Sequence, residues 1–224
     1  FPGMLLEKEV SNLKKLITTA NYSSAVAIFG GSKVSTKIKV IEYYLKKFGK
    51  VIIGGAMANT FLFSKKINIG ASIFEKSMQK IAKSLLDYYG DKISLPDDVV
   101  TVDKSKKIQL RAIGDIKKDE KILDIGPQTR MKYFSFVSEC SCLLWNGPLG
   151  FYEQKPFDEG TNFVIKAVKN NNNKNFFSVA GGGDTISMLN HAKASDYFSF
   201  ISTGGGAFLE FIQGSGLPGL DSLN

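Results

Sequence analysis

Residues 25–31 read AVAIFGG, five apolar residues followed at once by two glycines. A short apolar run without polar alternation is typical of a strand buried on both faces, as in a parallel sheet covered by helices. The next stretch, 34–48, places Ile38, Ile41 and Leu45 on one helical face. The sequence therefore predicts a unit of strand, glycine loop and helix at this point.

The same unit recurs along the chain. Further apolar runs, each followed by glycine within two residues, lie at 51–53, 121–125, 142–145, 176–180 and 199–202. Two more strand-like segments are expected at 93–95 and 99–102, and helices at 6–17, 57–65, 75–89 and 157–170 and from about 129, 184 and 207 onward. Such repetition indicates a doubly wound α/β fold. We predict one Rossmann-like three-layer domain over residues 1–224, with about six core strands in a parallel sheet and helices on both faces.

Composition limits the class of protein. The 224 residues carry a formal net charge of +8. The sequence has no run of about 18 apolar residues and no signal peptide, so we expect a cytoplasmic protein without a membrane span. A positive net charge is typical of proteins that bind nucleic acid, a membrane surface or phosphorylated small substrates. Alternatively, the lysines form only a solvated surface. Because no basic cluster is interleaved with aromatic residues, nucleic acid is not the expected partner.

The cysteines and the histidine offer little chemistry. Cys142 begins the apolar run at 142–145 and is expected to be buried. Two cysteines and one histidine are too few for a disulfide framework or a zinc site. His191 stands near a predicted helix end, where a surface or capping role is the simpler interpretation.

The glycine clusters are the first candidate site. In an open parallel sheet, ligands bind beyond the carboxyl ends of the strands, and every glycine cluster above is expected at such an end. Glycine lets a phosphate approach the backbone amides, and the following helix adds unpaired N–H groups. The P-loop pattern is absent, and the G-x-G-x-x-G at Gly214, Gly216 and Gly219 follows a helix rather than a strand. We therefore predict phosphate binding without a P-loop or a dinucleotide fingerprint.

Polar residues beside the glycines narrow the ligand. Lys33 and Lys37 flank the first loop one predicted helical turn apart, so both can face one anion, unless they are two exposed lysines of a basic helix. Asp184 follows three glycines at a helix start, where a carboxylate either caps the helix or holds Mg²⁺ bridging phosphates. Asn146 and Glu153 bracket a turn after a strand. Each is either a turn former or a ligand contact, in which case Asn146 would donate to a phosphate and Glu153 would accept from ribose hydroxyls.

Together these residues resemble the phosphoglycerate kinase family. The matching segments, in the order in which the family has them, are GGSKVSTKI at 30–38, DIGP at 124–127, WNGPLGFYE at 145–153, GGGDT at 181–185 and STGGGA at 202–207. They span nearly the whole chain, and the ordered set is highly specific. The resemblance implies the C-terminal, nucleotide-binding half of a two-domain enzyme that moves phosphate reversibly between 1,3-bisphosphoglycerate and Mg-ADP.

The resemblance also implies residue roles. Lys37 is expected to contact the nucleotide phosphates and Lys33 to neutralise the phosphoryl group in transfer, while Asp184 holds Mg²⁺. The remaining nucleotide-binding residues implied for ADP or ATP are Gly30, Gly31, Gly54, Gly55, Leu123, Asn146, Pro148, Phe151, Glu153, Gly182, Gly183 and Thr185, with Gly54, Gly55, Leu123 and Phe151 around the adenine and Glu153 at the ribose. The amides of Gly204, Gly205 and Gly206 are expected to cap the transferring phosphoryl group, which suits a reaction that depends on positioning and charge neutralisation.

The sequence departs from the family at several positions. Ser32 and Thr36 replace a common alanine and aspartate, Phe151 is bulkier than the usual valine, and Ile122 stands where glycine is common. The family's N-terminal half, which binds 3-phosphoglycerate, has no counterpart here, and the chain starts at Phe1 rather than Met. We expect a monomeric piece that binds nucleotide but is inactive alone. The alternatives are a stand-alone nucleotide-binding module and a dinucleotide-dependent dehydrogenase, which would prefer NAD to ADP.

Overall fold

A six-stranded parallel sheet forms the centre of the computed structural model, which describes residue 11, residues 22–204, and residues 208 and 212. Its strands, in spatial order, are β3 (Ile93–Ser94), β2 (Lys50–Ile53), β1 (Ala25–Phe29), β7 (Cys142–Asn146), β8 (Phe177–Gly181) and β9 (Phe200–Ser202). The chain moves outward from β1 to β2 and β3, and in the opposite direction from β7 to β8 and β9. The junction of β1 and β7 is therefore the topological switch point of the sheet, where such folds bind ligands.

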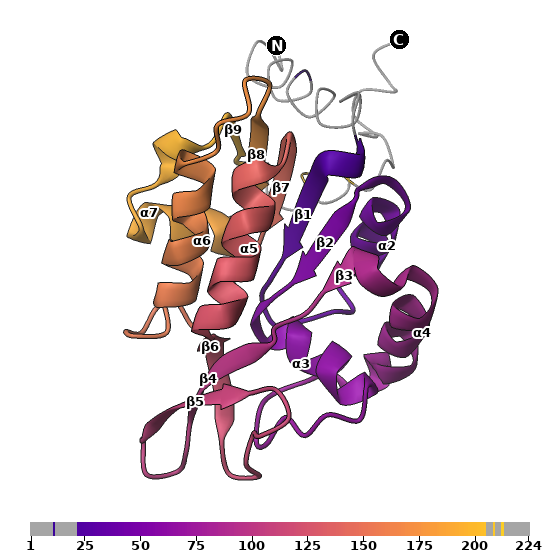
Figure 1. Ribbon diagram of the computed structural model, residues 1–224, viewed down its shortest axis with the longest axis vertical. Helices are drawn as coiled ribbons and strands as arrows, with labels where there is room; N and C mark the ends of the chain where they lie inside the picture. The colour runs from indigo at the N-terminus through magenta and orange to yellow at the C-terminus, as the bar shows by residue number, and fades with distance from the viewer. Residues whose placement is uncertain (1–10, 12–21, 205–207, 209–211, 213–224) are drawn as a thin grey trace.

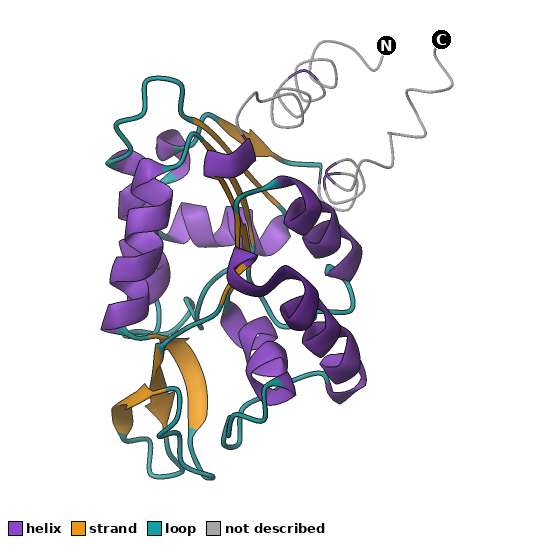
Figure 2. Ribbon diagram, turned by 45° about the vertical axis from the view of Figure 1, so that its right-hand side comes forward, coloured by secondary structure: helices purple, strands orange, loops and turns teal. Residues whose placement is uncertain are grey.

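Helices cover both faces of this sheet. The helices are α2 (Ile38–Lys47), α3 (Gly55–Ser64) and α4 (Gln79–Tyr89) on one face, and α5 (Pro127–Glu139), α6 (Glu159–Lys169) and α7 (Gly183–His191) on the other. Figure 2 shows the sheet nearly edge-on between the two helical layers. Short 3₁₀ turns lie at Tyr22–Ser24, Lys76–Met78, Gly90–Lys92 and Ser195–Tyr197. The three-layer α/β prediction is confirmed.

The central strands are apolar throughout because each face packs on a different core. In β1, Ala27 and Phe29 pack against α2, α3 and α4, while Val26 and Ile28 point to the opposite side and pack with α5, α6 and α7. Cys142 is buried in the first of these cores, as expected. The absence of alternation in AVAIF thus has a direct structural cause.

A second, antiparallel sheet was not predicted. It has the order β5 (Ile108–Ala112), β4 (Asp98–Val102), β6 (Lys121–Ile125) and lies at one end of the molecule (Figure 1). The expectation that 121–125 and its glycine belong to the parallel sheet is wrong, since β6 pairs antiparallel with β4. Strand β5 was missed because its residues alternate between exposed and half-buried, without an apolar run. The prediction that every glycine cluster lies on one rim therefore fails for Gly126.

Helix starts also differ from the prediction. Helix α2 begins at Ile38, not Val34, with Lys37 as its N-cap residue, so Lys33 and Lys37 do not lie one turn apart on a helix. The residues before Ile38 form a turn because Gly31 has φ +96° and Val34 is buried in the core. Helix α5 begins at Pro127, and Asp98 of β4 accepts hydrogen bonds from the amides of its first turn. The helices expected at 6–17 and from 207 lie outside the described residues.

Within the described part of the chain, no helix is both long and apolar enough to cross a membrane.

Candidate active site

Loops at the switch point interlock through their glycine backbones. The amides of Gly30, Gly31, Gly54 and Gly55 donate to the carbonyl oxygens of Asn146, Pro148, Phe29 and Leu149, at 2.9–3.0 Å. A Cβ on Gly30 would lie 1.9 Å from the Pro148 oxygen, so only glycine allows this approach. These four amides are thus occupied by the protein itself. The glycines thus allow the loops to pack closely, whereas the sequence predicted that their amides would be available to a phosphate.

Lys37 extends into this junction. Its Nζ donates to the carbonyl oxygens of Gly30 at 2.8 Å and Asn146 at 3.4 Å. Burial lowers the pKa of Lys37 from 10.5 to about 8, and the nearby charge of Asp184 opposes that shift. A half-buried ammonium facing a carboxylate across a strand junction is suited to gain a phosphate partner. Lys33, by contrast, is exposed on the loop surface.

The start of α7 forms the next part of the site. The N-cap residue is Gly182, with φ +98° and no side chain to cap the helix. Asp184 lies in the first turn and is exposed, so the interpretation of Asp184 as the cap is wrong. Thr185 is buried, and its hydroxyl donates to the Gly181 oxygen at 2.7 Å and accepts from the Gly147 amide at 2.8 Å. The first amides of such a helix and its dipole favour an anion.

Asn146 joins these loops at the end of β7. Its Nδ2 donates to the Gly181 oxygen at 2.7 Å, which ties β7 to the end of β8, just before α7. Its Oδ1 is buried and, among the described atoms, accepts no hydrogen bond. A buried acceptor of this kind is costly unless a partner arrives.

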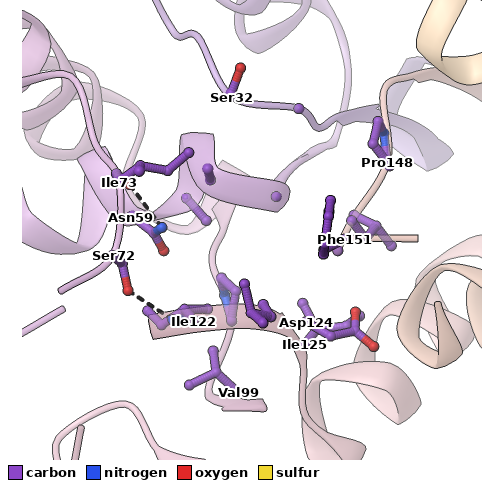
Figure 3. Close-up of a pocket in the computed structure, with 18 of the residues that line it drawn as sticks. Ser32, Asn59, Ser72, Ile73, Val99, Ile122, Asp124, Ile125, Pro148 and Phe151 are labelled. Atoms are coloured by element: carbon purple, nitrogen blue, oxygen red, sulfur yellow. Dashed lines mark hydrogen bonds between the residues drawn. The ribbon is translucent and has the colours of Figure 1, made fainter. Parts of the chain in front are cut away.

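A cavity of about 400 Å³ opens beside the junction. Figure 3 shows Ile73, Asn59 and Ser72 on one side, Pro148 and Phe151 on the other, and Ile122, Asp124 and Val99 along the base. Ile73 and Phe151 are 66% and 45% exposed, although both are large and apolar. Two exposed apolar side chains that flank an apolar cavity are typical of a binding site for a flat ring.

Asp124 is a buried carboxylate in the cavity wall. Its Oδ2 accepts hydrogen bonds from the Gly160 amide at 2.7 Å and from Arg130 at 3.2 Å, which ties β6 to α5 and α6. Arg130 also pairs with Glu159 at 2.7 Å. The pKa of Asp124 is raised from 3.8 to about 7, because the effect of burial exceeds that of these hydrogen bonds and of Arg130.

Asp124→Asn is expected to raise the free energy of unfolding above pH 7 and to leave it nearly unchanged near pH 4. A carboxyl with a raised pKa contributes most to stability when protonated, and this contribution is lost as pH rises from about 4 to about 7. Asparagine stays neutral, and Arg130 retains Glu159 as its partner. Urea unfolding across this pH range, with the exposed Asp196→Asn as the control, measures the difference. A gain of equal size at every pH would contradict the assignment.

The family model described as phosphoglycerate kinase matches residues 1–215. The chain belongs to the phosphoglycerate kinase family. It is 39% identical to the phosphoglycerate kinase of Caulobacter sp. over 230 residues and 41% identical to that of Sinorhizobium fredii over 231, covering 100% of this chain and 58% of each relative. The phosphoglycerate kinase structure from Coxiella burnetii superimposes with a TM-score of 0.91 at 35% identity, covering 98% of this chain and 58% of that one. The chain thus spans a little over half the length of these relatives.

The residues expected from the phosphoglycerate kinase resemblance fall into three groups. The cavity is lined by Gly31, Gly55, Leu123, Pro148, Phe151, Glu153 and Asp184. Beside it, at the strand junction and the start of α7, lie Gly30, Lys37, Gly54, Asn146, Gly182, Gly183 and Thr185. Lys33 is exposed nearby, the Gly204 amide donates to the Ser202 hydroxyl at 3.3 Å, and Gly205 and Gly206 lie outside the described residues.

Sequence reasoning missed several residues that line this cavity. Asn59, Ser72, Ile73 and Val99 line it, but they belong to none of the family's motifs. Asn59 is 1% exposed within the apolar helix α3, and a polar residue among so many apolar ones was the available clue. Ser72 and Ile73 lie in a segment without regular structure, where periodicity gives no information.

Proposed function

We propose that this chain is the nucleotide-binding half of a phosphoglycerate kinase. With the rest of a full-length enzyme, it would catalyse the reversible, Mg²⁺-dependent transfer of a phosphoryl group between 1,3-bisphosphoglycerate and ADP in glycolysis. The observation that carries the proposal is the position of the apolar cavity, which opens at the switch point beside Lys37 and the start of α7. A base site and an anion site are thus adjacent.

The cavity is proposed to hold the adenine and ribose. Its lining is mostly apolar, and Leu123 and Phe151 belong to one wall, where the Phe151 amide donates to the Leu123 oxygen at 2.7 Å. A purine has two apolar faces that pack well between side chains such as Ile73 and Phe151. Glu153 is exposed at the cavity and is proposed to accept hydrogen bonds from the ribose hydroxyls.

The phosphates are proposed to lie between Lys37 and the start of α7. Lys37 would exchange its carbonyl partners for phosphoryl oxygens, and the amides at Gly182 and Gly183 would add the helix N-terminus. An anion beside Lys37 favours its charged form, so binding should be accompanied by proton uptake near pH 8. Lys33, on the exposed loop, is proposed to meet the phosphoryl group in transfer, together with the Gly204–Gly206 amides.

Magnesium fits this arrangement as an ion held jointly by protein and nucleotide. In the described part of the chain, no group of three or more His, Cys, Asp or Glu side chains could hold a metal ion, so the protein alone forms no cage there. Asp184 supplies one exposed carboxylate beside the proposed phosphate site. Mg²⁺ is commonly bound by one or two carboxylates plus phosphates and water, and it would neutralise phosphate charge.

The substrate half of the reaction belongs to the remainder of the enzyme. The 3-phosphoglycerate and 1,3-bisphosphoglycerate sites are proposed to lie in the N-terminal half of full-length family members. The present chain, taken alone, is proposed to be a cytoplasmic monomer that binds nucleotide without turnover. Calorimetry with Mg-ADP, Mg-ATP and 3-phosphoglycerate tests this: the nucleotides should bind and 3-phosphoglycerate should not. Failure to bind either nucleotide would overturn the proposal.

Asp184→Ala is expected to weaken Mg-ADP binding by about tenfold while leaving the binding of metal-free ADP nearly unchanged, because it removes one metal ligand. Titrations with Mg²⁺ and with a chelator measure the two affinities. Asp196→Ala, which removes an exposed aspartate from the first turn of a 3₁₀ helix, is the matched control. Equal weakening with and without Mg²⁺ would remove Asp184 from the metal site.

A further inference from the structure

Residues 71–75, which we call the strap, form one wall of the cavity and are tied to the antiparallel sheet. The Ala71 amide donates to the Glu120 oxygen at 2.8 Å, and the Ser72 hydroxyl accepts from the Ile122 amide at 2.8 Å. Ser72 and Ile73 both line the cavity, and the Ser72–Ile122 bond is visible in Figure 3. The strap is therefore fixed relative to β6. It lies on the side of the cavity opposite Phe151 (Figure 3).

The strap is also tied to α3. Asn59 Nδ2 donates to the Ile73 oxygen at 3.0 Å, and the Glu75 amide donates to the Thr60 hydroxyl at 3.0 Å. Both side chains are buried, at 1% and 0% exposure. These bonds account for two otherwise unexpected polar residues inside an apolar helix. They hold the strap in one position although it has no regular secondary structure.

Glu75, at the end of the strap, holds the loop that carries the two lysines. Its Oε2 accepts from the Ser35 amide at 3.0 Å, and its Oε1 accepts from the Ser35 hydroxyl at 2.6 Å. Hydrogen bonds to an ionised carboxylate are about twice as strong as neutral ones. Although burial raises the pKa of Glu75, the hydrogen bonds from Ser35 and Val34 and the charge of Lys33 outweigh this and lower it. The carboxylate is therefore charged at neutral pH.

The lysine loop, residues 31–37, is braced at both sides of Ser35. Val34 is fully buried, and the Lys37 amide donates to its oxygen at 2.9 Å. The Thr36 hydroxyl donates to the Lys33 oxygen at 3.0 Å. The Thr36 side chain, at a position where an aspartate is common in the family, thus stabilises the loop by a hydrogen bond to the loop's own backbone. Glu75 adds an external anchor at the exposed turn between the two lysines.

We propose that Glu75 is a positioning residue of the nucleotide site. Through its hydrogen bonds to Ser35, Glu75 holds the loop that carries Lys33 and Lys37 in a fixed position relative to the strap at the base cavity. This inference rests on the proposed nucleotide-binding function. Ile73 and Glu75 belong to one short segment, so the wall against the base and the anchor of the phosphate-binding loop move together. Loss of Glu75 should release the lysine loop but leave the cavity formed, because Asn59, Thr60 and Ser72 still hold the strap.

The test compares ligands with and without phosphates. Glu75→Ala should weaken Mg-ADP binding by about tenfold and adenosine binding by less than about twofold, since it frees the loop at the phosphates and not the base cavity. Ser35→Ala should weaken Mg-ADP by about threefold, and the double variant should bind no more weakly than Glu75→Ala, because both changes remove the same contact. Calorimetry for ADP and NMR titration for adenosine measure the affinities in the 224-residue chain.

Controls separate positioning from general destabilisation. Glu42→Ala removes an exposed glutamate of α2 that pairs with Lys46, and it should change neither affinity. Glu75→Gln keeps an acceptor for the Ser35 hydroxyl and should restore part of the ADP affinity. An unchanged ratio of ADP to adenosine affinity in Glu75→Ala, or in Ser35→Ala if the former does not fold, would overturn the inference. A wild-type chain that binds neither ligand would instead overturn the proposed nucleotide site.

Discussion

Replacing Lys37 by methionine is expected to weaken Mg-ADP binding by about a hundredfold, because it removes a charged donor to the phosphates. The side chain lies at the junction of β1 and β7, where its ammonium already reaches two carbonyl oxygens at the rim. Methionine has a similar length and no charge, so the loop packing should be preserved.

The same substitution is expected to stabilise the ligand-free fold. The pKa of Lys37 falls from 10.5 to about 8 on folding, so keeping the ammonium charged inside the protein costs about 3 kcal/mol at neutral pH. Methionine avoids this cost but leaves the Gly30 oxygen without its Nζ donor, which costs about 1–2 kcal/mol. The net gain should be about 1–2 kcal/mol below pH 8 and should shrink as pH rises, becoming a net loss of about 1–2 kcal/mol above pH 10.5, where lysine is neutral in both states and only the lost hydrogen bond remains.

Two measurements check this pair of effects. Calorimetry gives the ADP affinity, and urea unfolding from neutral to alkaline pH gives the stability difference. Lys39→Met is the control, since Lys39 is exposed on the same helix and should show neither effect. A variant that binds ADP as tightly as wild type would remove Lys37 from the site. A large loss of stability would show that its carbonyl contacts outweigh the cost of burial.

Gly30→Ala is expected to destabilise the fold by about 3 kcal/mol or more, because the new methyl group would overlap backbone rather than a movable side chain. Its Cβ would lie 1.9 Å from the Pro148 oxygen and 2.7 Å from the Gly147 oxygen. To make room, the loops after β1 and β7 would have to separate, and the bonds from Gly30 to Asn146 and from Gly31 to Pro148 would lengthen.

Gly183→Ala is the matched control for this substitution. A Cβ at Gly183, the first residue of α7, meets nothing within 4 Å, so alanine should be neutral or slightly stabilising. Thermal and urea unfolding of both variants give the comparison. Similar stabilities for the two variants would show that the glycine after β1 is not required for loop packing.

The centre of the parallel sheet was predictable because β1, β2 and β7 are buried on both faces, which makes each of them a largely apolar run. Strand β5 was not predictable on that basis, since Gln109 and Arg111 alternate with exposed apolar residues. Lys37 and Asp184 were identified by their motifs, and both lie at the same site. The chemistry of the glycines was harder to infer, because a glycine whose amide is free and one whose backbone packs closely look identical in sequence.

The remaining parts of the site depend on segments that are distant along the chain. Ser72 of the strap meets Ile122 of β6 and belongs to no helical or strand period. Ser35 and Glu75 are forty residues apart and become neighbours only when the chain has passed through α2, β2 and α3 and returns to the first loop. No local pattern carries this information, because it arises from tertiary packing.

The pairing of β1 with β7 has a consequence for the order in which the protein is made. Ala25 pairs with Cys142, and Phe29 pairs with Asn146, so one edge of β1 stays open until the ribosome has synthesised β7. The pocket of Lys37 includes the Asn146 carbonyl and cannot form earlier. Nucleotide is therefore expected to bind nascent chains only after β7 has emerged from the ribosome and docked on β1, which makes ligand binding a late marker of folding during translation.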